Sequence, residues 1–162
     1  MPKMVSRRLL LAGLAALTLA ACSSYAPTTA TPAISVTPEQ MLAEINTVRR
    51  QQGKAPLVYN SALAQAARGQ ARLMAERDQL SHNFGPGNSL RERVSAVGYT
   101  GPVGENLAGG QRTLEAVMQG WLDSSGHRST LLSERWTSVG MVMVPAHAGS
   151  RYGVFWAAIF GT

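Results

Sequence analysis

Apolar residues recur at helical spacing in the region that follows residue 36. Thr37 can cap a helix, Pro38 suits its first turn, and Gln40 can complete a capping box with Thr37. Apolar side chains then follow three or four residues apart: Met41, Leu42, Ile45 and Val48. This spacing predicts an amphipathic helix that ends at Gly53.

Three further helical segments are predicted in the middle of the chain. An alanine-rich stretch over residues 60–79 has small and apolar residues at helical spacing. Ser89 and Glu92 form a second capping box, which predicts a short helix after them. Residues 113–122 carry an apolar stripe that includes Trp121, and a short turn ends near residue 132. The first two thirds of the chain are therefore expected to be mainly helical.

The pattern changes in the C-terminal region. Residues 138–144 and 152–160 are rich in valine, methionine and aromatic residues, and turn-forming residues separate them. This pattern predicts a β-hairpin. Both strands are almost continuously apolar, so we expect helices to cover both faces of the sheet. The core is expected to depend on four large residues: Trp121, Phe155, Trp156 and Phe160.

The N-terminus has the pattern of a targeting signal. Lys3, Arg7 and Arg8 precede an apolar segment over residues 9–19, which is too short to span a bilayer of about 30 Å as a helix. The sequence Leu19-Ala20-Ala21-Cys22 resembles a bacterial lipobox, in which the cysteine is lipidated and becomes the first residue. An ordinary signal peptide with an incidental cysteine is the alternative.

The lipobox interpretation predicts three parts: a lipoprotein signal peptide (residues 1–21), a flexible tether (22–36) and a folded domain (37–162). The tether is uncharged and rich in small residues and proline. The expected location is the cell envelope, outside the cytoplasm. The outer membrane is favoured if the cell has one, because neither Ser23 nor Ser24 is an aspartate that resembles an inner-membrane retention signal. The choice between general secretion and twin-arginine export stays open.

Charge and cysteine content narrow the function classes. The 162 residues carry a formal charge of +6, but three of the basic residues lie in the signal. The remaining charge of +3 comes from 12 basic and 9 acidic residues, with no basic arm that includes aromatic residues. Nucleic acid is therefore not an expected partner. A single cysteine also excludes a disulfide framework and a cysteine-based zinc site.

Three polar residues beside glycine-rich turns are the candidates for chemistry. His82 and His127 follow predicted helices, and Glu105 lies between them at intervals of 23 and 22 residues. Functional groups are often found at such element ends. The spacing is not that of a local metal motif, and no Gly-x-Ser-x-Gly nucleophile motif is present. Each residue could equally be a loop histidine or a capping glutamate.

Several motifs occur together in a characteristic order. They are Ile45-Asn46-x-x-Arg49, Ser81-His82, Gly104-Glu105-Asn106-Leu107-Ala108, Trp121-x-x-Ser124-x-Gly126-His127-Arg128 and Trp136-Thr137-x-Val139-Gly140. With these motifs, the chain resembles the bacterial lipoprotein branch of the CAP superfamily, which includes cysteine-rich secretory proteins, antigen five and pathogenesis-related proteins. The resemblance covers residues 38–162. It implies an α+β fold, a three-layer α-β-α sandwich with a central, mainly antiparallel sheet.

The resemblance also implies a cleft with two histidines and two acidic residues, which binds a divalent metal such as zinc in some members. His82 and Glu105 match this set. Ser124 and Arg135 stand where eukaryotic members have the second acid and the second histidine, and His127 is the bacterial substitute. We therefore expect His82, Glu105 and His127 to converge as a weak metal site. Asn106 and Arg128 are expected to brace the surrounding loops.

Three functions are compatible with these observations. The first is a non-catalytic, membrane-tethered module that binds a lipid, an envelope component or a protein. The second is a metal-assisted hydrolase or protease with Glu105 as general base and the two histidines as ligands or proton shuttles. The missing second acid and the absence of a recognisable nucleophile favour the binding module. A purely structural role in the envelope is a third possibility.

Overall fold

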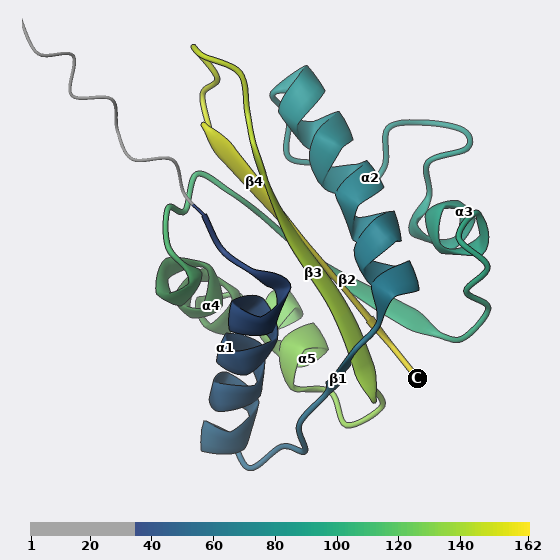
Figure 1. Ribbon diagram of the computed structural model, residues 1–162, viewed down its shortest axis with the longest axis vertical. Helices are drawn as coiled ribbons and strands as arrows, with labels where there is room; N and C mark the ends of the chain where they lie inside the picture. The colour runs from purple at the N-terminus through teal and green to yellow at the C-terminus, as the bar shows by residue number, and fades with distance from the viewer. Residues whose placement is uncertain (1–34) are drawn as a thin grey trace, which may run out of the picture. The chain divides into compact units, whose positions relative to one another are not determined.

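The computed structural model describes residues 35–162 (Figure 1). They belong to one compact unit. The predicted signal peptide, the lipidation site at Cys22 and nearly all of the predicted tether lie outside the described residues. No helix in the described part of the chain is both long and apolar enough to cross a membrane.

Residues 35–162 form five helices and four strands. The helices are α1 (Pro38–Gln51), α2 (Ser61–Arg77), α3 (Leu90–Ser95), α4 (Leu114–Asp123) and α5 (Ser125–Leu132). Both predicted capping boxes are confirmed, Thr37 with Gln40 before α1 and Ser89 with Glu92 before α3. The helix predicted over residues 113–122 also begins as expected, because the Thr113 side chain caps α4. The helix starts therefore follow local side-chain chemistry.

The four strands form one sheet in the order β1-β3-β4-β2. They are β1 (Val58–Tyr59), β2 (Val103–Gly109), β3 (Ser138–Pro145) and β4 (Val154–Gly161). The predicted hairpin is confirmed as the antiparallel pair β3 and β4, and β2 pairs antiparallel with β4. Only the short β1 runs parallel to its neighbour. The sheet is thus mixed but mainly antiparallel, as expected.

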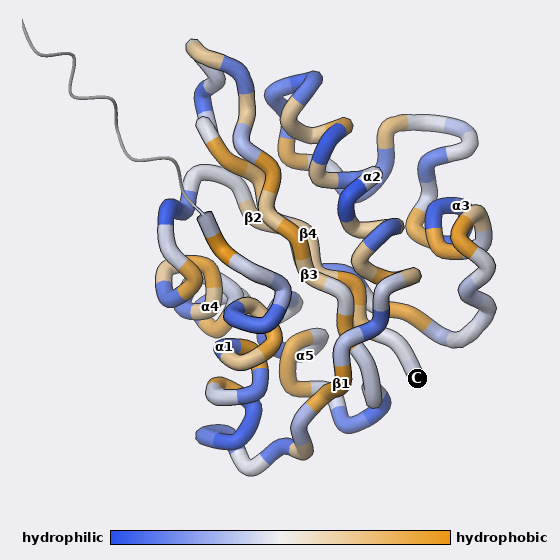
Figure 2. The backbone as a smooth tube through the Cα atoms, in the orientation of Figure 1, coloured by the Kyte–Doolittle hydropathy of each residue, from blue (hydrophilic) through white to orange (hydrophobic). Residues whose placement is uncertain are grey.

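Helices cover both faces of the sheet and complete the expected three layers. Figure 1 shows α1, α4 and α5 on one side of the strands and α2 and α3 on the other. In Figure 2, the sheet is largely hydrophobic, whereas hydrophilic residues lie on the outer helical surfaces. This distribution explains the continuous apolar runs of β3 and β4, since neither face of the inner strands meets water.

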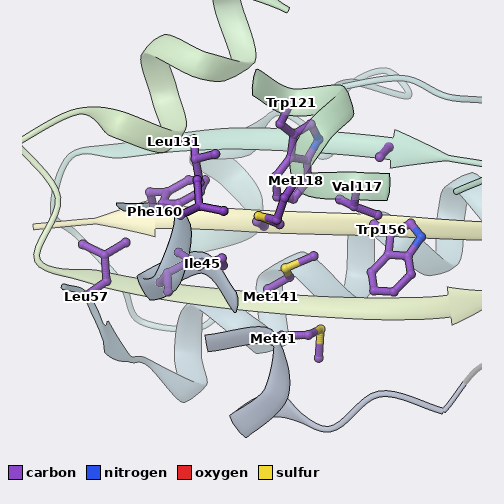
Figure 3. Packing of buried hydrophobic residues seen from close by; sticks show 14 of the residues in the cluster. Met41, Ile45, Leu57, Val117, Met118, Trp121, Leu131, Met141, Trp156 and Phe160 are labelled. Atoms are coloured by element: carbon purple, nitrogen blue, oxygen red, sulfur yellow. The ribbon is translucent and has the colours of Figure 1, made fainter. Parts of the chain in front are cut away.

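Two hydrophobic clusters fill the spaces between the layers. One, drawn in Figure 3, joins α1, α4 and α5 to the sheet and contains Trp121, Trp156 and Phe160. The other lies beneath α2 and α3 and contains Phe155 and Ile159. Every residue of β4 is buried, and the four core residues predicted from the sequence are all fully or almost fully buried.

Two close contacts fix the helices against neighbouring elements. Gly140 of β3 lies directly against the start of α2, where an added Cβ would meet backbone atoms of Leu63 and Ala64. Arg49 of α1 is fully buried, and its guanidinium donates to the carbonyl oxygens of Ala55, Leu131 and Ser133. Arg49 therefore holds the end of α5 against α1.

Candidate functional site

Glu105 is the centre of the polar cluster, and both of its carboxylate oxygens are engaged. Its Oε2 lies 2.9 Å from Nδ1 of His82, and its Oε1 accepts a hydrogen bond from the guanidinium of Arg93. The Glu105 side chain is only 2% exposed. A buried carboxylate needs such partners, because an unpaired charge would carry a large desolvation penalty.

Arg93 supplies the positive charge of this cluster from α3. Its side chain is 6% exposed. Besides Glu105, it donates to the carbonyl oxygens of His82, at 3.1 Å, and Asn88, at 2.5 Å. The Ser89–Glu92 capping box fixes the first turn of α3, which directly precedes Arg93. The capping box thereby sets the position of Arg93. Arg93 therefore neutralises Glu105 and holds the loop that carries His82.

His82 is the exposed member of the cluster. Its side chain is 60% exposed, and it lies in the loop between α2 and α3. The loop is held by Arg93 and by the buried Gln70, whose amide donates to the carbonyl oxygen of Ser81. A carboxylate at Nδ1 favours the tautomer with hydrogen on that nitrogen. Nε2 of neutral His82 is then a free hydrogen-bond acceptor.

His127 approaches β2 from the other layer. The amide of the fully buried Asn106 donates to the His127 carbonyl oxygen at 2.9 Å. Side chains alternate along a strand, so Asn106 and Glu105 point to opposite faces of β2. Burial lowers the pKa of His127 below its usual value near 6.5, and the charge of His82 lowers it further. His82 thus acts on the pKa of His127 from the neighbouring loop.

Arg128, and the two residues that depart from the eukaryotic pattern, have local roles in the structure. Arg128 is exposed, and its Nε donates to the carbonyl oxygen of Leu122, across the junction of α4 and α5. Ser124 is the residue at which α4 ends and α5 begins. The guanidinium of Arg135 lies 5.4 Å from the centre of the Trp136 ring. No hydrogen bond or ion pair in residues 35–162 connects these three side chains to Glu105.

The contacts of the cluster do not bring all three predicted ligands together. The Glu105 carboxylate contacts His82 with one oxygen and Arg93 with the other. In agreement, residues 35–162 contain no group of three or more histidine, cysteine, aspartate or glutamate side chains that could hold a metal ion. The predicted convergence of His82, Glu105 and His127 is therefore direct only for His82 and Glu105.

Arg93 is the member of the cluster that was not predicted from the sequence. It lies on the buried face of α3 together with Val94, and Leu90 and Val97 continue this face. An arginine within an apolar helical stripe is a recognisable signal, because a buried guanidinium needs an acidic or carbonyl partner. Its partner, Glu105, lies 12 residues away in another element.

Comparison with known proteins gives consistent matches. The profile of the Cysteine-rich secretory protein family, CAP, matches residues 42–160. YkwD of Bacillus subtilis is 29% identical over 115 residues, which are 70% of this chain and 45% of YkwD. The membrane protein YlbC of the same organism is 32% identical over 111 residues, which are 67% of this chain and 32% of YlbC. The chain thus spans less than half the length of these relatives.

Solved structures share the fold. An outer surface protein from Borrelia burgdorferi has a TM-score of 0.66 at 20% identity, with coverage of 76% of this chain and 90% of that protein. An extracellular protein with an SCP domain from Bacillus anthracis has a TM-score of 0.62 at 25% identity, with coverage of 78% and 44%. The same fold is therefore found in an outer surface protein and in an extracellular protein of bacteria.

Proposed function

Because the chain belongs to the Cysteine-rich secretory protein (CAP) family, we propose that it is a non-catalytic binding module tethered to a membrane outside the cytoplasm. The tether is a lipid on Cys22. The ligand is an envelope component, a lipid or a protein, and it binds where His82 and His127 flank β2. Family membership alone does not establish this activity, which rests on the chemistry of the site.

The full engagement of the Glu105 carboxylate carries the proposal. A general base must reach the proton that it abstracts, directly or through one water. Glu105 is 2% exposed and paired on both oxygens, so it serves to orient His82 and to balance the charge of Arg93. Within residues 35–162, His82 itself makes no hydrogen bond to a hydroxyl or thiol side chain that it could activate as a nucleophile. These contacts favour binding over hydrolysis.

The lipid anchor is supported by the sequence pattern around Cys22 and by the kinds of protein that share the domain. The single cysteine of the chain is at the position that a lipobox requires. One relative is a membrane protein, and a structural relative is an extracellular protein. Several acyl chains on one cysteine would give stable anchoring, since each buried CH₂ contributes about 0.8 kcal/mol.

Two measurements test this function. In the first, the full chain is purified in detergent and titrated with zinc by calorimetry, and casein is supplied as a hydrolysis substrate. We expect neither zinc binding in the micromolar range nor casein cleavage above the level of the matched Glu105→Gln variant. Zinc binding that is lost in His82→Ala, or cleavage that is lost in Glu105→Gln, would favour the metal-assisted hydrolase instead.

The second measurement tests the anchor. Cys22→Ser is expected to leave the membrane fraction or to keep its signal peptide, whereas Ser23→Ala, one residue away, is expected to behave as the wild type. Membrane fractionation and mass spectrometry of the two variants distinguish these results. An unchanged location and mass of Cys22→Ser would refute the lipid anchor without affecting the conclusion about the Glu105 cluster.

A further inference from the structure

The exposed part of Glu105 is its main chain. The residue as a whole is partly exposed, yet its side chain is only 2% exposed. Water therefore reaches the backbone of Glu105, while the carboxylate is covered by His82 and Arg93. This is unusual for a charged residue, whose side chain is normally the exposed part.

The direction of the β2 backbone groups follows from two hydrogen bonds. The Gly110 N–H donates to the Val154 carbonyl oxygen, so even-numbered residues of β2 face β4. The Leu107 carbonyl oxygen instead accepts from the Trp121 indole, on the side away from β4. Backbone groups alternate in direction along an antiparallel strand. The N–H and C=O groups of Val103 and Glu105 therefore also point away from β4.

These groups lie on a free edge of the sheet. β2 is the last strand in the order β1-β3-β4-β2. No hydrogen bond in residues 35–162 reaches the outward backbone groups of Val103 or Glu105. Trp121 closes the edge at Leu107, so the open part ends there. We call the outward backbone of Val103 and Glu105 the β2 edge site.

We propose that the β2 edge site binds an extended peptide segment of a partner protein, which adds to the sheet as a strand beside β2. This inference rests on the proposed binding function and names its ligand class. The site offers N–H donors and C=O acceptors side by side, which an extended peptide matches and an inorganic anion or a metal ion does not. The residues that flank the site determine where such a strand can lie.

The flanking residues favour a strand of limited length. His82 is exposed on one side of β2, and α5, which carries His127, packs against the other side. Arg93 neutralises the charge of Glu105. The β2 edge site therefore has no net charge that would disfavour the uncharged backbone of a peptide. With Trp121 closing one end, the open edge pairs with about five peptide residues at roughly 3.3 Å each. The exposed ring of His82 supplies one further polar group beside this strand.

Histidine NMR signals provide a direct test in the full chain, in detergent, because the chain has only three histidines. His82 and His127 report on the β2 edge site, and His147, in the exposed turn between β3 and β4, is an internal control. The probe is a capped pentapeptide of alternating threonine and valine, at about 5 mM, which would fill a millimolar site. We expect the ring signals of His82 and His127 to shift while those of His147 stay unchanged.

Two matched comparisons test the role of the backbone. N-methylation of the central peptide residue removes one N–H donor and is expected to weaken binding about tenfold or more. In the protein, Val103→Pro removes an outward N–H at the first residue of an edge strand, where proline is tolerated. Val103→Ala loses the same side chain but keeps this N–H. We expect weaker peptide binding in Val103→Pro than in Val103→Ala.

Three results would overturn the inference. They are unshifted His82 and His127 signals at the highest peptide concentration, equal binding of the N-methylated peptide, and a response to inorganic phosphate but not to peptide. Each of these results concerns the ligand class alone. The proposed function is judged separately, by the zinc, casein and fractionation experiments.

Discussion

Gly140 is the point where the sheet and α2 approach each other most closely, and this contact predicts a large effect of one methyl group. A Cβ at Gly140 would lie 2.0 Å from the Ala64 nitrogen and 2.5 Å from both the Ala64 Cα and the Leu63 carbonyl carbon. Cβ atoms essentially never approach other atoms closer than 3.0 Å, so the helix start would have to move by about 1 Å.

The expected cost of Gly140→Ala follows from the nature of these neighbours. All three atoms belong to the backbone of the first turn of α2, so no side-chain rotation relieves the overlap. Overpacking of this kind costs about 1–3 kcal/mol, and we expect about 3 kcal/mol here. The backbone conformation of Gly140 lies outside the left-handed region, so the effect is steric and does not reflect backbone strain.

Urea denaturation of the full chain measures this change, and Gly69→Ala is the matched control. Gly69 lies within α2, and a Cβ there would meet no atom within 4 Å. Alanine is favoured over glycine inside a helix, so Gly69→Ala is expected to stabilise the protein by about 0.5–1 kcal/mol. A free energy of unfolding for Gly140→Ala within about 0.5 kcal/mol of the wild type would refute the close packing of α2 on β3.

Three further predictions concern the site and the core. Arg93→Met leaves the Glu105 carboxylate buried without its cation and is expected to cost about 3–5 kcal/mol by urea denaturation. The double variant Arg93→Met/Glu105→Leu should cost less than Arg93→Met alone, and an equal or greater cost would contradict a buried ion pair. Trp121→Ala is expected to cost about 3–5 kcal/mol in the same assay, because it leaves a cavity and frees the Leu107 carbonyl, whereas an unchanged midpoint would contradict its burial. The pKa of His127 is lower in the folded protein than its unfolded value near 6.5, so the unfolded chain binds more protons as the pH falls below about 6.5. Stability should therefore decline on acidification through this range, and His127→Gln should show a smaller decline; identical pH dependence of the two proteins would contradict the shift.

Local signals predicted most of the fold. The capping boxes at Thr37 and Ser89 started their helices as expected, because a cap depends on residues only three positions apart. The C-terminal hairpin was also correct, since its strands are apolar throughout and a turn separates them. These features depend on neighbouring residues, so the sequence alone was enough to predict them.

Strand β2 and the Arg93 contact could not be predicted in the same way. Gly104 and Gly109 make β2 look like a turn, yet glycine is required where Trp136 and Tyr152 pack closely on the strand. The pairing of Arg93 with Glu105 depends on how α3 packs against β2, and no spacing in the sequence reveals it. The predicted site did not include Arg93, which pairs with the carboxylate of Glu105.

The position of β4 has a consequence for the order in which the domain can fold. β4 follows every other helix and strand of residues 35–162, yet it lies between β3 and β2, and both hydrophobic clusters include its side chains. A chain that emerges from a ribosome or a translocation pore N-terminus first would expose the apolar faces of both helical layers until β4 arrives. Neither half of the core can close without β4, so both helical layers depend on the last strand to be made.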